Sequence, residues 1–141
     1  LSDVAAQQES MLALNHVTLT LDCPADLLCY CDNALLNTVL TSIVNNAKRY
    51  CRSKILLSAH QAADDAVCFS VEDDGDGYPE PLIAGLNAQP FDSDIRVGNT
   101  GLGIYFAAVI AQLHRRGTVK GHITLDNESR LGGARFSLFL P

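Results

Sequence analysis

The chain has no long apolar run and no excess of basic residues. No apolar stretch reaches the roughly 18 residues of a membrane-spanning helix, so we expect no membrane contact by this domain. Its 10 lysines and arginines are outnumbered by 16 acidic residues, and the net charge is -6. Because nucleic-acid binding relies on basic surfaces, we expect no nucleic-acid partner. Hydrophobic residues make up 48% of the 141 residues, which is enough for one folded domain.

Motifs for a metal centre built from side chains alone are also missing. The chain has 5 cysteines but no C-x-x-C pair, and its 4 histidines are scattered without ligand spacing. Cys29 and Cys31 flank Tyr30, and an extended backbone would point their thiols to opposite faces. We therefore expect reduced cysteines, as in a cytosolic protein, rather than a zinc site.

Two kinds of hydrophobic periodicity alternate along the chain. Strands are predicted where apolar and polar residues alternate, at 17–21, 54–60, 67–73, 122–126 and 135–140. Helices are predicted at about 34–52 and from 102 to 113. Residues 1–14 carry a weak helical pattern, which we interpret as the end of a preceding helical segment or a linker. The folded domain is then expected over residues 15–141.

The helix predicted at 34–52, with Asp32 or Asn33 as its N-cap, carries two useful stripes. The apolar stripe consists of Leu36, Leu40, Ile43, Ala47 and Tyr50. Ser42, Asn46 and Arg49 form a polar stripe at its border. An amide and a guanidinium one turn apart could face a pocket beside the core, or they could be an ordinary polar flank. The spacing leaves both interpretations open.

The segment VEDDGDG, residues 71–77, follows a predicted strand. Asp73 continues the apolar phase of that strand, so its carboxylate is predicted to point to the core side where the strand ends. Gly75 and Gly77 permit a tight turn or a close approach of the backbone to a bound group. A carboxylate that points inward beside such a turn is suited to accept a hydrogen bond from the amino group of a ligand. A solvated acidic turn is the alternative.

The segment GNTGLG, residues 98–103, leads into the second predicted helix. Glycines at a helix start expose backbone N–H groups and the positive end of the helix dipole, which suits phosphate. A flexible loop end is the alternative. The irregular stretch 78–99 before it has the length of a lid. A P-loop is not predicted, because no Gly-Lys-Ser/Thr follows the glycines.

In this order, the motifs resemble those of the ATP-binding catalytic domain of sensor histidine kinases, in the group that includes gyrase, Hsp90 and MutL. The residues that carry the resemblance are the N box at 39–50, the G1 box at 71–77, the G2 box at 98–104 and the closing GGARFSLFLP. The resemblance implies an α+β fold of the Bergerat type. This is a two-layer α/β sandwich, with helices on one face of a mixed, mostly antiparallel sheet and ATP bound between helix and sheet.

The resemblance also implies residue roles. Asn46 would bind Mg²⁺ and, with Arg49, would act in catalysis by contacting the phosphates; Tyr50 would pack against the nucleotide. Asp73 would accept a hydrogen bond from the adenine amino group. The other nucleotide-binding residues would be Gly75, Gly77, Gly98, Thr100, Gly101, Leu102 and Gly103. Phe91 would be the counterpart of the phenylalanine box in the ATP lid.

Several features depart from the pattern of that family, among them a short lid with a degraded phenylalanine box. Ser42 stands where many histidine kinases have asparagine and the hydrolysing relatives have a glutamate base, which argues against an efficient ATPase. Asp74 replaces a common asparagine, and we expect its charge to weaken nucleotide binding or to increase its dependence on Mg²⁺. Residues 115–121 are interpreted as an insertion or a divergent turn.

The implied function is that of the catalytic domain of a two-component sensor histidine kinase. Such a domain binds Mg-ATP and transfers its γ-phosphoryl group to a histidine on a separate dimerisation domain of the same protein, with a response regulator downstream. None of the 4 histidines suits the acceptor, which we expect upstream of Leu1. We expect a cytoplasmic domain whose parent could be membrane-anchored. The alternatives are a degenerate nucleotide-binding module that acts by protein contact and a serine kinase of the anti-sigma-factor type.

Overall fold

The computed structural model describes residues 1–88 and 101–141. One sheet has the strand order β1-β2-β3-β7-β6. Its strands are β1 (Thr18–Asp22), β2 (Lys54–Gln61), β3 (Val67–Asp73), β6 (His122–Asp126) and β7 (Arg135–Leu140). The helices are α1 (Ser2–Ala13), α2 (Asn33–Tyr50), α3 (Glu80–Ala88) and α4 (Gly101–Leu113), with a short 3₁₀ helix at Ala63–Asp65.

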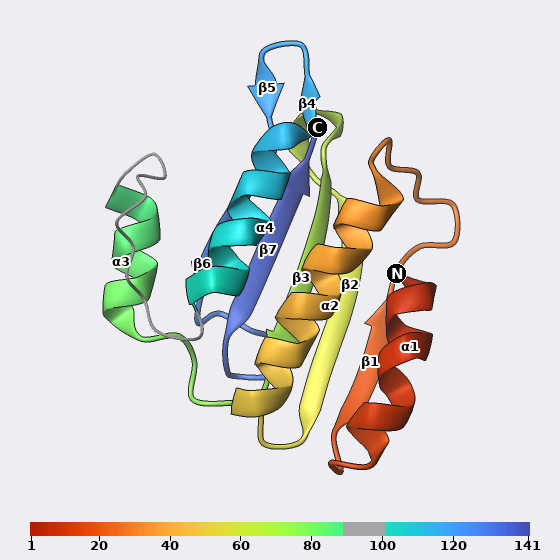
Figure 1. Cartoon of the computed structure of the whole chain (residues 1–141), viewed down its shortest axis with the longest axis vertical. Helices are drawn as coiled ribbons and strands as arrows, with labels where there is room; N and C mark the ends of the chain where they lie inside the picture. Colours follow the sequence, from red (N-terminus) through yellow and green to blue (C-terminus); the bar gives the residue numbers. More distant parts are fainter. Residues whose placement is uncertain (89–100) are drawn as a thin grey trace.

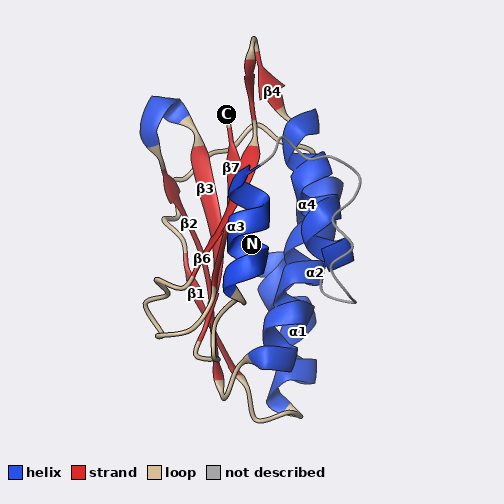
Figure 2. Cartoon of the chain, turned by 90° about the vertical axis from the view of Figure 1, so that its left-hand side faces the viewer, coloured by secondary structure: helices blue, strands red, loops and turns tan. Residues whose placement is uncertain are grey.

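The architecture has two layers, as the resemblance implies. β1 pairs with β2 in parallel, whereas the other neighbouring strands pair antiparallel. Helices α1, α2 and α4 lie on one face of the sheet, and α3 lies beyond its β6 edge (Figures 1 and 2). The expected α+β sandwich with a mixed, mostly antiparallel sheet is therefore confirmed.

Helix α2 is the central helix of the covering layer. It begins as predicted, because the Asp32 carboxylate accepts hydrogen bonds from the backbone N–H groups of Ala34 and Leu35 at 2.9 and 3.0 Å. The predicted apolar stripe is buried from Leu36 to Ala47. Tyr50 is different: it is the last residue of α2 and is 56% exposed, so it does not continue the buried stripe.

Helix α1 packs against β1 and α2. Val4 and Leu12 are each only 1% exposed and belong to the same hydrophobic core as the residues of α2. This packing makes α1 part of the core, whereas the domain boundary suggested at residue 14 stays a prediction. Burial on that side is the reason why a weak helical pattern forms a complete helix here.

The segment 115–121 folds as a hairpin. Its strands are β4 (Arg115–Arg116) and β5 (Val119–Lys120), which pair antiparallel. The hairpin extends beyond the sheet near the C-terminus (Figure 1). Among the described residues, no helix combines the length and the apolar character that crossing a membrane requires.

Candidate functional site

The end of β3 places the Asp73 carboxylate in a nearly buried position. Its Oδ1 atom accepts hydrogen bonds from the backbone N–H groups of Gly75 and Ala134 at 2.8 and 3.2 Å. Burial raises the pKa of Asp73, and these two N–H groups oppose the shift. The second oxygen, Oδ2, takes part in neither bond. Asp73 is thus a fixed carboxylate with one oxygen held by the backbone.

The neighbouring Asp74 has a different environment. Its carboxylate accepts hydrogen bonds from the backbone N–H groups of Arg52, Ser53 and Lys54 at 2.8, 3.0 and 3.1 Å, and from the Ser53 hydroxyl at 3.0 Å. Burial alone would raise the pKa of Asp74, but the hydrogen bonds outweigh it and lower the pKa to about 2. Asp74 therefore ties the end of β3 to the turn between α2 and β2. Its expected effect on nucleotide binding stays a prediction.

Two glycines shape the turn after Asp73. A Cβ atom on Gly75 would overlap the backbone carbonyl of Tyr50, so only glycine permits this approach between β3 and the end of α2. Gly77 has φ +88°, and a Cβ atom there would lie 2.7 Å from the side chain of Asn127. The spacing of these glycines predicted a tight turn, and the structure shows what the turn packs against.

Asn127 is a residue of this region that the sequence did not reveal. Its Oδ1 accepts a hydrogen bond from the backbone N–H of Tyr78 at 2.6 Å, and its Nδ2 donates to the Tyr78 carbonyl at 3.0 Å. Tyr78 is the first residue after the glycine turn. Asn127 therefore anchors the point where the chain leaves β3 toward α3. The two residues are 49 positions apart, and no local pattern could have paired them.

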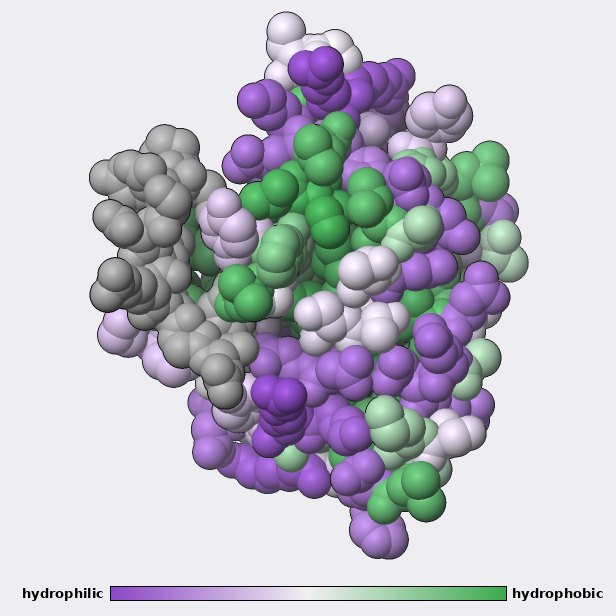
Figure 3. Space-filling view, viewed as in Figure 1, coloured by the Kyte–Doolittle hydropathy of each residue, from purple (hydrophilic) through white to green (hydrophobic). Residues whose placement is uncertain are grey.

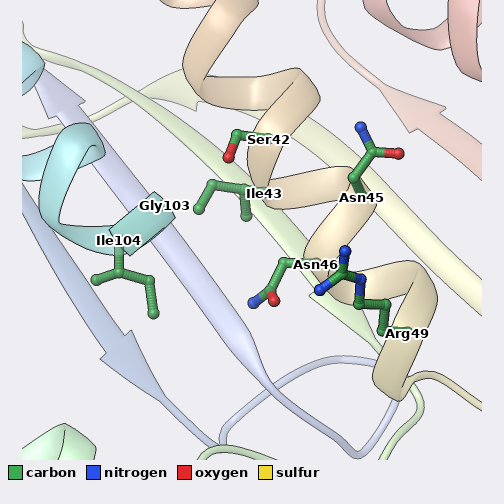
Figure 4. A pocket seen from close by; sticks show the side chains of 7 residues that line it. All are labelled: Ser42, Ile43, Asn45, Asn46, Arg49, Gly103 and Ile104. Carbon is green, nitrogen blue, oxygen red and sulfur yellow. The ribbon is translucent and has the colours of Figure 1, made fainter. Parts of the chain in front are cut away.

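The polar stripe of α2 faces α4 across a small cavity. Ser42, Asn46 and Arg49 line a space of about 100 Å³ together with Gly103 and Ile104 of α4. Figure 4 shows Ser42 and Asn46 extending from the side of α2 that faces α4. A Cβ atom on Gly103 would lie 3.0 Å from the Ser42 hydroxyl oxygen, so a glycine keeps this space open. Of the two interpretations of the stripe, the cavity-facing one fits the observed geometry.

The remaining predicted site residues are only partly described. Gly101 begins α4, and Leu102 in its first turn is 64% exposed. Gly98, Thr100 and Phe91 lie outside the described residues.

The turn between β6 and β7 also contacts Asp73. The Ser129 hydroxyl and the Gly133 N–H donate to the Asp73 backbone carbonyl at 2.9 and 3.0 Å. The Asp73 N–H in return donates to the Ala134 carbonyl at 3.0 Å. Pairing of β7 with β3 places this turn against Asp73.

No part of the described chain groups three or more His, Cys, Asp or Glu side chains as a metal ion would require. The prediction that the thiols of Cys29 and Cys31 point to opposite faces is wrong, because the segment is irregular and the two thiols interact. Burial and then the neighbouring Cys31 raise the pKa of Cys29 to about 12, so it stays a protonated thiol.

Comparisons with known proteins agree with the fold and with the motifs. The family model of histidine kinase-, DNA gyrase B-, and HSP90-like ATPases matches residues 31–141. The sensor protein BasS of Salmonella typhimurium strain LT2 is 32% identical over 127 residues, which are 89% of this chain and 34% of BasS. The sensor histidine kinase CpxA of Escherichia coli strain K12 is 34% identical over 111 residues, 75% of this chain and 22% of CpxA.

A solved structure extends the likeness to the whole chain. The nucleotide-free catalytic domain of the histidine kinase ThkA has a TM-score of 0.76 and 22% identity, over 99% of this chain and 89% of that domain. At this identity the likeness concerns the fold alone. The chain spans about a third of BasS and about a fifth of CpxA. Family model, relatives and fold agree, and the chain belongs to the family of histidine kinase-, DNA gyrase B-, and HSP90-like ATPases.

Proposed function

We propose that the chain binds Mg-ATP between α2 and the sheet and donates the γ-phosphoryl group to a histidine on a separate domain. The observation that carries this proposal is the Asp73 carboxylate, which is nearly buried and has one oxygen fixed by backbone N–H groups. A fixed acceptor at a strand end, in a fold that also has a cavity lined by an amide and a guanidinium, suits an adenine nucleotide better than it suits a solvated turn.

In this proposal Asp73 reads the base. Its free oxygen would accept a hydrogen bond from the amino group of adenine. Guanine has a carbonyl at that position, so a guanine nucleotide would leave two acceptors facing each other and unpaired. The turn at Gly75 and Gly77 would lie at the adenine end of the site, and Tyr50, which has an exposed side chain, ends α2 next to Gly75. Base selectivity would then come from one carboxylate on a rigid strand.

The phosphates would lie toward Asn46 and Arg49. When Mg²⁺ binds, it neutralises charge on the phosphates; it typically takes few protein ligands and otherwise phosphate oxygens and water. One amide oxygen from Asn46, which lines the cavity, fits that need. Arg49 would orient the phosphates, and the N–H groups at the start of α4 would add donors. Catalysis would rest on positioning and charge neutralisation.

An apolar stripe on α4 is the proposed contact for the helical domain that carries the acceptor histidine. Leu102, Phe106, Val109 and Leu113 repeat on one side of α4, with exposed fractions of 64%, 53%, 37% and 65%. Hydrophobic residues gather over α4 in the space-filling view (Figure 3). Exposed apolar patches of this kind mark interaction sites.

A response regulator would act downstream. This domain would lie in the cytoplasm, and the parent protein would be a sensor with a membrane anchor.

The proposal is tested by calorimetry of ATP binding with and without Mg²⁺, for the parent and for Asp73→Asn. The parent should bind ATP more tightly with Mg²⁺. Asp73→Asn should bind at least about tenfold more weakly, because an amide in place of the carboxylate weakens the hydrogen bond to the adenine amino group. If Asp73→Asn binds ATP as well as the parent does, Asp73 is not the adenine reader. If the parent binds no nucleotide, the chain is a protein-contact module instead.

A further inference from the structure

Arg130, in the turn between β6 and β7, reaches across the face of the sheet opposite the helices. Its Nε donates to Oε1 of Glu72 at 2.9 Å, and its own backbone N–H donates to Oε2 at 2.6 Å. Its terminal nitrogens donate to Oδ2 of Asp22 and to the hydroxyl of Ser58, both at 3.0 Å. One side chain therefore connects the turn to β3, β2 and β1.

Glu72 is the buried partner in this network, with 3% of its side chain exposed. A buried carboxylate is costly unless it is paired and hydrogen-bonded, and Arg130 supplies both kinds of contact. Hydrogen bonds to Asp22 and Glu72 raise the pKa of Arg130, so the guanidinium stays charged. Replacing Arg130 would leave a carboxylate without its main partner, and the turn would lose its attachment on this face.

Glu72 and Asp73 are consecutive residues, so their side chains leave β3 on opposite faces. The same turn contacts both. On the helix side, Ser129 donates to the Asp73 carbonyl and Ala134 to its Oδ1. A Cβ atom on Gly133 would lie 2.6 Å from Asp73 Oδ1, so the turn packs against Asp73 without slack. If the turn shifted on the open face of the sheet, the Asp73 carboxylate on the helix-covered face would therefore move with it.

We propose that Arg130 is a positioning residue for Asp73, the proposed acceptor of the hydrogen bond from the adenine amino group. By holding the turn against Glu72, it fixes the place of the Asp73 carboxylate and so sets the preference for adenine over bases that lack the 6-amino group. Because Asp73 reads adenine only under the proposed function, the role of Arg130 rests on that function. The determinant of base preference would then include a residue on the opposite side of the sheet from the pocket. A misplacement of about 1 Å is enough to weaken such an interaction strongly.

The test compares ATP with purine riboside triphosphate, which lacks the 6-amino group but keeps the same phosphates. Dissociation constants for both are measured by calorimetry with Mg²⁺, for the parent and for Arg130→Gln. We expect Arg130→Gln to raise the dissociation constant for ATP about tenfold and that for the analogue by less than about twofold. A purely structural role would weaken both nucleotides alike and leave their ratio unchanged.

Arg135→Gln is the matched control. The substitution removes one positive charge on the same face. The Arg135 side chain hydrogen-bonds Asp126 and Glu128, whereas its interaction with Glu72, its partner across the β3–β7 pair, is electrostatic. This control should lose stability and keep the preference for ATP. Arg130→Lys keeps the charge and one donor for Glu72, so it should fold and show an intermediate preference. If Arg130→Gln fails to fold, the ratio of the two dissociation constants in Arg130→Lys still tests the positioning role.

A double-mutant cycle separates the possible outcomes. In an Asp73→Asn background, Arg130→Gln should no longer change the ratio of the two nucleotides, because the group that it positions is gone. If the parent prefers ATP and both Arg130 variants keep that preference, the positioning role is overturned while the proposed function stands. If the parent shows no preference for ATP over the analogue, the assignment of Asp73 fails first and the role of Arg130 falls with it.

Discussion

At the residue scale, two adjacent carboxylates at the end of β3 serve different purposes. Asp73 has one oxygen bound by backbone N–H groups, and burial raises its pKa. Asp74 accepts hydrogen bonds from the backbone N–H groups of a neighbouring turn, and its pKa is lowered to about 2. The strand alternation that sends one side chain to the core sends the next one away from it. The first is therefore suited to binding and the second to holding the fold.

Replacing Asp74 should affect stability more than binding. Asp74→Ala removes the acceptor for three backbone N–H groups and one hydroxyl, and we expect a loss of about 2 kcal/mol in the free energy of unfolding. Urea unfolding measures this loss. The affinity of the folded variant for ATP should not fall, in contrast with Asp73→Asn, and a moderate rise would agree with the expectation that the Asp74 charge weakens nucleotide binding. A large loss of affinity with full stability would instead place Asp74 at the nucleotide.

At the element scale, the β6–β7 turn and helix α4 border the proposed site from two sides. The turn touches Asp73 and, through Asn127, the backbone of Tyr78. Helix α4 offers Gly103 to the cavity and an apolar stripe to the outside. Both elements are distant in sequence from α2 and β3. Their contribution to the site depends on how the sheet and its covering helices pack.

Asn127→Ala should loosen the start of the segment that leads to α3. Its side chain makes two hydrogen bonds to the Tyr78 backbone, and we expect a loss of about 1 kcal/mol in stability. Hydrogen exchange should show faster exchange of the Tyr78 amide, and ATP binding should weaken. Asn15→Ala is the control, because Asn15 also bonds a backbone carbonyl but lies at the end of α1. Equal protection of the Tyr78 amide in Asn127→Ala and the parent would contradict the anchoring role.

The apolar stripe of α4 should matter for phosphoryl transfer and not for nucleotide binding. Phe106→Glu places a charge in the middle of the stripe, so docking of an acceptor domain should weaken and the transfer rate should fall at least about tenfold. The assay measures transfer from radiolabelled ATP to a helical dimerisation domain that carries the proposed acceptor histidine. Leu28→Glu, at another exposed apolar residue, should transfer normally. Equal rates for Phe106→Glu and the parent would exclude the stripe as the docking surface.

At the scale of the whole molecule, binding and folding should respond differently to acid. The pKa of Asp74 is about 2 in the folded chain against 3.8 as its ordinary value, so its stabilisation is complete above about pH 4 and is lost as the pH falls toward 2. The pKa of Asp73 is raised, so it is protonated at a higher pH than Asp74. Protonation of Asp73 relieves its burial penalty and removes the ionised acceptor.

ATP affinity should therefore decline at a higher pH than stability does. Calorimetry of ATP binding and circular dichroism of the free domain, both measured from pH 7 to pH 2, test this order. In Asp74→Asn the acid-induced loss of stability between about pH 4 and pH 2 should be reduced, because the titrating group is gone. Coincident loss of binding and fold in the parent would contradict the separate roles of the two carboxylates.

Much of the fold follows from local patterns. The alternation of residues such as Val67, Phe69 and Val71 predicted a strand, and the spacing of Leu36 and Leu40 predicted the buried face of α2. Both are confirmed, because burying one face of an element is the main driving force of its packing. The exposed Tyr50 differs because the pattern does not reveal where a helix ends on the sheet.

The candidate site was predictable where a residue's place depends on its own element. The phase of β3 placed Asp73 inward, and helix periodicity grouped Ser42, Asn46 and Arg49 on one stripe. Asn127 and Arg130 could not be predicted in this way. Their partners lie 49 and 58 positions away, and a polar residue in a turn carries no signal of which strand it will meet.

The sequence by itself determined the class of this protein: the motif order, the strand and helix periods and the inward phase of Asp73 are local properties. Only the tertiary structure decided which groups hold that aspartate in place, why Asp74 supports a turn, and that the Arg130 guanidinium binds Glu72 on the open face. The physical reason is that periodicity depends on neighbouring residues, whereas hydrogen bonds between distant segments depend on strand register and on the path of every loop.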